Sequence, residues 1–207
     1  MSLDTCALFW QKDWGNKMKN KNFNLIICGV GGQGQITLLR ILSEAAILEK
    51  KDFKAAETHG LSQRGGAVEV HFRMGKVFSP LVPEAGADLI LALEFQEALR
   101  SMYYCSKETK ILINDKIIPI IGERPLKKEK ILKEIEKFTK NIEIVEASKI
   151  CQEKLKKEIL AGVYLISFAS FRKLLPLKPK SILEGIKKIV PPKYLEANVK
   201  AFKLSRV

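Results

Sequence analysis

Residues 24–49 read NLIICGVGGQGQITLLRILSEAAILE, and the architecture of the chain follows from this segment. Residues 24–28 are an apolar run that ends at glycines, which predicts a buried strand. Residues 33–49 carry apolar side chains at helical spacing and predict an amphipathic helix. A buried strand, a glycine turn and a helix in this order are typical of an α/β sheet.

The rest of the chain continues this alternation. Further strands are predicted at residues 53–56, 67–73, 87–93, 110–114 and 142–145. Helices are predicted at 95–104 and 127–139, and from 148 onward with breaks at prolines 176, 179, 191 and 192. Residues 67–73 alternate apolar and polar side chains and predict an added antiparallel element, followed by a hairpin turn at 75–76 into 77–78. The expected fold is a Rossmann-like, mostly parallel sheet with helices on both faces, one antiparallel element and a helical C-terminal part.

Length and composition indicate a globular chain. Its 207 residues are 46% hydrophobic and 29% charged, which argues against disorder. Residues 21–207 are expected to form one domain, because no low-complexity linker interrupts them. Residues 1–20 show no clear period and are expected to be an N-terminal extension. Met18 is one possible start of the chain; the alternative is an arm whose Trp10 and Trp14 pack on a partner.

The net charge of +13 is unevenly distributed, with +1 in residues 1–100 and +12 in residues 101–207. Most of the excess is lysine interleaved with glutamate, a pattern typical of solvated helix faces. Basic strands interleaved with aromatic residues, as in RNA-binding proteins, are absent. The sequence therefore predicts no nucleic-acid binding.

The cysteines and histidines give no metal site. The four cysteines lie far apart without a C-x-x-C pair, which excludes a self-contained ferredoxin-type cluster, and there are only two histidines. Separated cysteines are typical of reduced thiols, so a cytoplasmic location is expected. The apolar runs are too short to span a bilayer, and no signal peptide is recognisable, so neither membrane insertion nor export is expected.

Glycines concentrate in the turn after the first strand. This turn matches G-x-G-x-x-G, a pattern that lets an anion or another backbone approach the start of a helix. Nucleotide binding would need an acidic residue about 20 positions later to hold the ribose, and Glu57 belongs to a separate cluster. Close packing or an interface is therefore the favoured interpretation. The residues of this turn are Gly29, Gly31, Gly32, Gln33 and Gly34.

A second cluster lies between two predicted strands and reads as a polar loop. A rigid sheet that carries such a loop predicts a binding site. The guanidinium of Arg64 is suited to a carboxylate or phosphate, and His59 to proton transfer. The alternative is a structured turn in which Glu57 pairs with Arg64. The chain offers no nucleophile with a base, so no catalytic residue is predicted. The cluster comprises Glu57, Thr58, His59, Gly60, Gln63, Arg64, Gly65 and Gly66.

These motifs carry a family resemblance. GVGGQG, ETHGLSQRGGAVEVHFRMG and SPLVPEAGADLILALEFQEALR, in this order, resemble the beta subunit of indolepyruvate:ferredoxin oxidoreductase, the counterpart of the gamma subunit of the pyruvate and 2-oxoglutarate enzymes. The resemblance is strong over residues 23–104. Further on, Asn198 and Ala201-Phe202 resemble the late N-x-x-A-F element, without the glycine that often follows it. The THG and QRGG elements are more similar to the indolepyruvate branch than to the pyruvate branch.

The resemblance implies a subunit of a larger enzyme that oxidatively decarboxylates 2-oxo acids, here aryl pyruvates, to acyl-CoA and CO2 with ferredoxin as acceptor. It places thiamine diphosphate, magnesium and the iron–sulfur clusters in a large alpha subunit, with no cofactor in this chain and coenzyme A as a substrate of the complex. It also places the polar loop at the interface with that subunit, near substrate carboxylate or coenzyme A phosphates. The alternatives are a nucleotide-binding dehydrogenase, a protein-binding module, or the pyruvate or 2-oxoglutarate branch of the family.

Overall fold

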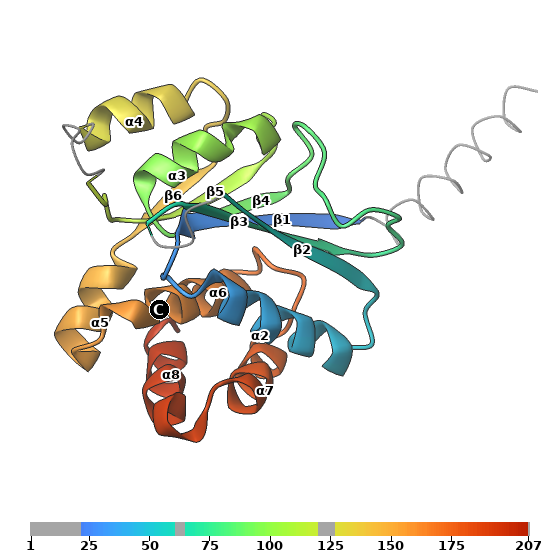
Figure 1. Cartoon of the computed structure of the whole chain (residues 1–207), viewed down its shortest axis with the longest axis vertical. Helices are drawn as coiled ribbons and strands as arrows, with labels where there is room; N and C mark the ends of the chain where they lie inside the picture. The colour runs from blue at the N-terminus through green and yellow to red at the C-terminus, as the bar shows by residue number, and fades with distance from the viewer. Residues whose placement is uncertain (1–21, 61–64, 120–126, 207) are drawn as a thin grey trace, which may run out of the picture.

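The computed structural model describes residues 22–60, 65–119 and 127–206. Its six-stranded sheet has the order β2-β3-β1-β4-β5-β6 (Figure 1). β3 runs antiparallel to both of its neighbours, and β1, β4, β5 and β6 are parallel. This confirms the expected, mostly parallel sheet with one antiparallel element. The strands are β1 (Phe23–Val30), β2 (Phe53–His59), β3 (Ala67–Met74), β4 (Leu89–Ala92), β5 (Lys110–Asn114) and β6 (Ile142–Val145).

Helices cover both faces of the sheet, as expected. In Figure 1, α3 and α4 lie on one face, and α2 lies with the C-terminal helices on the other. The α-helices are α2 (Gln35–Leu48), α3 (Phe95–Arg100), α4 (Lys128–Ile135), α5 (Ala147–Leu155), α6 (Ala161–Phe171), α7 (Pro179–Ile189) and α8 (Pro192–Leu204). Two 3-10 helices are η1 (Ser101–Tyr104) and η2 (Glu158–Leu160). Among the described residues, no helix has the length and apolarity needed to cross a bilayer.

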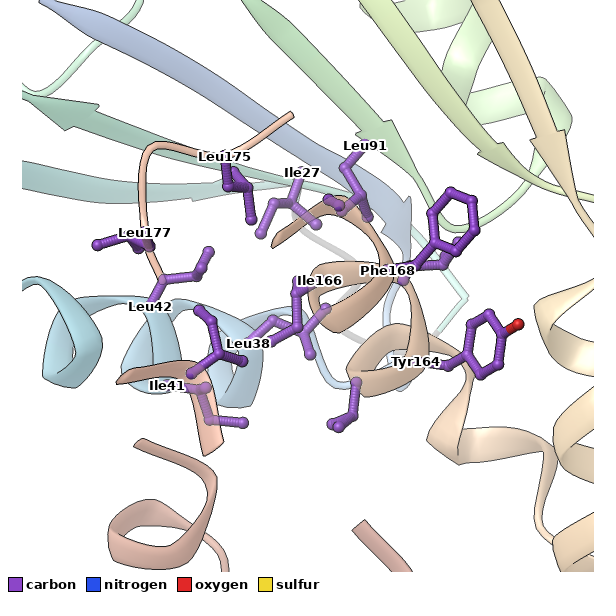
Figure 2. Packing of buried hydrophobic residues seen from close by; sticks show 14 of the residues in the cluster. Ile27, Leu38, Ile41, Leu42, Leu91, Tyr164, Ile166, Phe168, Leu175 and Leu177 are labelled. Carbon is purple, nitrogen blue, oxygen red and sulfur yellow. The ribbon is translucent and has the colours of Figure 1, made fainter. Parts of the chain in front are cut away.

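The central strand β1 explains why its sequence is apolar throughout. Leu25 and Ile27 belong to the core beneath α2 and α6, whereas Ile26 and Cys28 belong to the core beneath α3. Successive side chains of a strand point to opposite faces, so a strand covered on both faces needs a continuous apolar run. Figure 2 shows Ile27 with Leu42 and Ile166 in the larger core.

The helices on that face pack tightly. Gly185 of α7 lies so close to α2 that a Cβ at this position would be 2.6 Å from the carbonyl oxygen of Ile41. Contact at this distance is possible only without a side chain. The helix α7 therefore covers the outer side of α2, which is the helix that follows the glycine turn.

Several bounds differ from the sequence expectation; the helix expected at 127–139, for example, ends at Ile135. The strand expected at 53–56 continues to His59, with Glu57 opposite Val70 and Thr58 opposite Glu69. An edge strand needs only a backbone partner on one side, so its polar side chains can face water. These residues therefore extend a strand and do not begin a loop.

The hairpin expected at 77–78 is wrong, because no strand forms at Val77. Instead, Nη1 of Arg73 donates to the carbonyl oxygens of Ser79 and Leu81, at 3.0 Å each. The side chain of Arg73 thus holds residues 79–81 beside β3 without a second strand.

Candidate functional site

The glycine turn connects β1 to α2 at the edge of the sheet where the parallel strands end, here called the carboxyl edge. Gly32 and Gly34 have φ of +101° and +86°, and a Cβ at either position would meet nothing within 4 Å. These two glycines are therefore required by backbone conformation and not by close approach. Gly34 is the N-cap of α2, so the helix begins at Gln35, two residues later than the sequence predicts.

Two glutamine side chains fold back onto the turn. Oε1 of Gln33 accepts a hydrogen bond from the N–H of Val30 at 2.7 Å, and Nε2 of Gln35 donates to the carbonyl of Val30 at 2.9 Å. A Cβ on Gly29 would lie 2.5 Å from Gln33 Oε1 and 2.7 Å from Gln35 Nε2. Gly29 therefore leaves space for these two amides, which we call the glutamine pair.

The two sequence motifs meet at this edge. The N–H of Gly31 donates to the carbonyl of Gly66 at 2.8 Å. Glu57, exposed on β2, lines a hollow of about 400 Å³ together with Gly32, Gly34 and the start of α2. Sequence reasoning treated the motifs as separate, and the sheet order places them side by side. Gly60 and Gly65, which belong to the second motif, follow β2 and precede β3 at the same edge, and Gly65 has a φ of +75°.

Part of the second motif falls outside the described residues. Gln63 and Arg64 belong to residues 61–64, which the structure does not describe. The expected pairing of Glu57 with Arg64 therefore stays a prediction, and so does the anion-binding role of Arg64. For His59 the structure gives the backbone only, paired in register with Val68.

On the other side of the turn, two neighbouring hollows open at the carboxyl edge. A polar hollow of about 280 Å³ lies beside Gly32, Leu93 and Asn114, between the ends of β1, β4 and β5. A largely apolar hollow of about 600 Å³ lies between the start of α2, η2 and α8. Gln33 and Ile159 line both hollows. β1 and β4 lie where the strand order reverses, the position at which open α/β sheets bind ligands.

The polar hollow has residues that sequence reasoning missed. Asn114, at the end of β5, donates to the carbonyl of Leu93 at 3.0 Å and to Ser148 Oγ at 2.8 Å, and it accepts from the Ser148 N–H at 3.0 Å. Lys116 forms an ion pair with Glu158 and holds the pKa of that carboxyl below its usual range. Their position in the sequence could have indicated Asn114 and Lys116, because they lie at or just after the end of a buried strand. Polar residues that follow buried parallel strands gather at one edge of the sheet.

The described residues contain no evident catalytic group at this edge. Burial raises the pKa of the thiols of Cys28, Cys105 and Cys151, the last to about 11. No cluster of three or more metal-ligating side chains occurs in the described ranges. The edge offers amide side chains, glycine backbone and the Lys116–Glu158 ion pair. These groups can bind and orient a ligand and keep water away from it.

Such an edge is typical of an α/β domain that contributes binding surface. The chain belongs to the pyruvate ferredoxin/flavodoxin oxidoreductase family, whose model matches residues 24–206. It is similar to indolepyruvate oxidoreductase subunit IorB of Archaeoglobus fulgidus, with 37% identity over 186 residues that cover 87% of this chain and 92% of the relative. The chain is thus a gamma-type subunit of a 2-oxoacid:ferredoxin oxidoreductase, which confirms the resemblance.

Solved structures confirm the fold. Pyruvate oxidoreductase subunit PORC of Thermotoga maritima has a TM-score of 0.67 at 20% identity, covering 90% of this chain and 96% of that one. The 2-oxoglutarate:ferredoxin oxidoreductase of Magnetococcus marinus, with 2-oxoglutarate, coenzyme A and succinyl-CoA bound, has a TM-score of 0.68 at 13% identity. That match covers 90% of this chain and 30% of the larger one.

Proposed function

We propose that this chain is the non-redox subunit of a thiamine-dependent oxidoreductase that converts aryl pyruvates, including indolepyruvate, to acyl-CoA and CO2, with ferredoxin as electron acceptor. Thiamine diphosphate, magnesium and the iron–sulfur clusters belong to a large alpha subunit, and this chain is inactive alone. The name of the Archaeoglobus relative supports the indolepyruvate branch.

The observation that carries the proposal is the convergence of both sequence motifs on the carboxyl edge. The contact between Gly31 and Gly66, and the hollows on both sides of Gly32, form one surface with groups suited to binding. In the proposed complex this surface faces the alpha subunit's active site. The neighbouring polar and apolar hollows suit coenzyme A, which has an extended pantetheine arm and anionic phosphates, and Lys116 and Lys157 line them.

The test is reconstitution with the large subunit. We expect ferredoxin reduction that requires both chains and coenzyme A, with kcat/KM higher for indolepyruvate than for pyruvate or 2-oxoglutarate. Lys116→Ala should raise the KM for coenzyme A several-fold and leave the KM for the oxo acid unchanged. Lys130→Ala is the matched control, because this exposed lysine lies on α4 over the opposite face of the sheet. Full activity of the large subunit alone, or a preference for pyruvate, would contradict the proposal.

The glutamine pair weighs against a nucleotide-binding dehydrogenase. In dinucleotide-binding turns, the glycines let the pyrophosphate approach the backbone. Here two backbone N–H groups of the turn already have partners within the chain: Val30 donates to the Gln33 side chain, and Gly31 donates to the Gly66 carbonyl. Neither is free to bind a phosphate. Titration of the isolated chain with NADH or NADPH should therefore give no binding at micromolar concentrations, whereas saturable micromolar binding would favour the dehydrogenase.

A further inference from the structure

The strand β2 is an outer strand of the sheet and is open on one side. It pairs with β3 and with no other described strand. The ladder with β3 runs without interruption from Phe53 to His59, so no bulge turns this edge away. Proteins usually shorten an open edge, place proline in it or cover it, because its unpaired backbone groups can recruit another strand. The other outer strand, β6, has four residues, whereas β2 has seven and no proline.

The direction of the outward backbone groups of β2 follows from one hydrogen bond. The N–H of Gly75 donates to the carbonyl of Asp52 at 2.8 Å, so Asp52 directs its backbone groups towards β3. This direction alternates along an antiparallel strand. Phe53, Ala55 and Glu57 therefore direct their N–H and carbonyl groups away from β3. The open side of β2 thus presents a regular row of donors and acceptors.

The helix α2 adds an apolar flank beside this edge. One side of α2 is covered by α7, where Gly185 approaches Ile41. Ile36 is turned by about 140° from Ile41 around the helix, and Ile47 lies three turns beyond Ile36 on the same flank. These two side chains are 46% and 57% exposed. Ile36 lines the same hollow as Glu57, so the exposed flank lies on the β2 side of the helix.

Opposite charges accompany the edge and the flank. Arg40 lies one turn after Ile36 on α2, and Glu57 lies near the end of β2; both are exposed. Neither forms an ion pair with another described residue. Because α2 begins beside the end of β2 and runs towards its start, Arg40 lies over the middle of the strand. An acidic group brought to that point by another molecule would complement it.

We propose that the open edge of β2 binds a second copy of this chain, antiparallel and about a twofold axis at Ala56, so that the two six-stranded sheets join into one. In a twofold interface the same surface is used by both copies. Residues directly opposite each other in an antiparallel pair must both direct their backbone groups across the join, or both away from it. With Ala56 at the axis this condition holds, since Ala55 of one copy then pairs with Glu57 of the other.

Three features favour this register. The small side chain of Ala56 lies where the two strands approach most closely. Lys54 lies opposite Thr58 of the second copy, so no like charges are directly opposed. Glu57 of the second copy lies beside the middle of the first copy's β2, within the region over which Arg40 lies. The isoleucine flank of α2 also faces its counterpart across the axis, which removes apolar surface from water.

This inference does not depend on the proposed function, and its test needs only the full chain. Sedimentation equilibrium over a range of micromolar concentrations should show a dimer that dissociates on dilution. Ala55→Pro removes one outward N–H and no bond to β3, and proline is tolerated on edge strands. This variant should be a monomer that unfolds at nearly the wild-type temperature.

A disulfide tests the position of the axis. In a Cys6→Ser background the remaining cysteines, Cys28, Cys105 and Cys151, are buried. Ala56→Cys in this background places two thiols opposite each other at the axis, so mild oxidation should link most chains in pairs. Ile144→Cys is the matched control, because it places an exposed thiol on the other outer strand, β6, and should stay largely unlinked.

Charge reversal separates a contact between copies from a contact within one copy. Arg40→Glu and Glu57→Arg should each raise the dissociation constant of the dimer about tenfold, because two like-charge contacts replace two attractive ones. An equimolar mixture of the two variants should restore nearly the wild-type value. Unlike copies then form two opposite-charge pairs, although neither variant can form such a pair within its own chain.

The results that would overturn the proposal are equally specific. They are a monomer at every concentration, a dimer that persists in Ala55→Pro, equal linking of the two cysteine variants, or a mixture no tighter than its components. If Ala55→Pro fails to fold, the disulfide and the mixture decide. Protection of the β2 amides from hydrogen exchange only after addition of the large subunit would assign the edge to that subunit and would also overturn the proposal.

Discussion

Replacing Gly29 with alanine tests whether the glycine turn is held by its own glutamine side chains. The added Cβ would lie 2.5 Å from Gln33 Oε1 and 2.7 Å from Gln35 Nε2, and 3.0 Å from the Leu93 Cβ. No positive φ is involved at this position, so the backbone itself tolerates alanine. The effect should come from displacing the two amides.

The magnitude follows from the bonds that would be lost. Each side-chain hydrogen bond to Val30 contributes about 1 kcal/mol net, and leaving the Val30 N–H without its partner costs about 1 kcal/mol more. Alanine recovers roughly 0.5 kcal/mol by restricting the unfolded chain. We therefore expect a loss of about 2–3 kcal/mol in the free energy of unfolding, equivalent to a Tm lower by about 5–10 °C for a chain of this size.

The assay is a double-mutant cycle measured by urea unfolding. Gln33→Ala alone should cost about 1–2 kcal/mol, but it should cost almost nothing in the Gly29→Ala background, because the bond is already lost. Gly32→Ala serves as the control, because its Cβ would meet open space and only its φ of +101° is strained. Additivity of Gly29→Ala and Gln33→Ala within about 0.5 kcal/mol would refute the reasoning.

Four further predictions follow from individual positions. Gly34→Val should lower stability by about 2 kcal/mol, measured by urea unfolding, because valine does not suit φ of +86°. Lys156→Gly should raise stability by about 1 kcal/mol in the same assay, because Lys156 ends α5 with φ of +56°. In a Cys6→Ser variant, the buried Cys28, Cys105 and Cys151 should react with a disulfide reagent only on unfolding. From sequence alone, Arg64→Lys should lower kcat/KM of the reconstituted complex about tenfold, whereas Arg64→Ala within about twofold of wild type would show a surface turn residue.

Local sequence patterns predicted the elements that are buried on both faces. β1 and β4 are continuous apolar runs because helices cover both sides of the sheet. Such runs can be recognised in the sequence alone. The extension of β2 to His59 was not predictable, because Glu57 and Thr58 are polar and an edge strand is defined by backbone pairing with β3. Polar residues that join a sheet only through their backbone hydrogen bonds give no hydrophobic pattern in the sequence.

The candidate site was predictable only in part for a related reason. The glycine turn has a recognisable spacing, and its glycines do adopt positive φ at Gly32 and Gly34. The contact between Asn114 and Ser148 joins residues 34 positions apart, and the hydrogen bond from Tyr104 to Glu69 joins residues 35 positions apart. Such contacts depend on the order of strands in the sheet, which a local pattern does not specify.

The close packing of α7 on α2 has a consequence for synthesis of the chain. The ladders among β1, β2 and β3 involve only residues 23–74, so they can form early on the ribosome. The surface of α2 around Ile41 is covered by Gly185, which is translated more than 140 residues later. The face of α2 around Ile41 therefore stays uncovered until α7 has been translated, so the partly made chain exposes apolar surface of the kind that promotes aggregation.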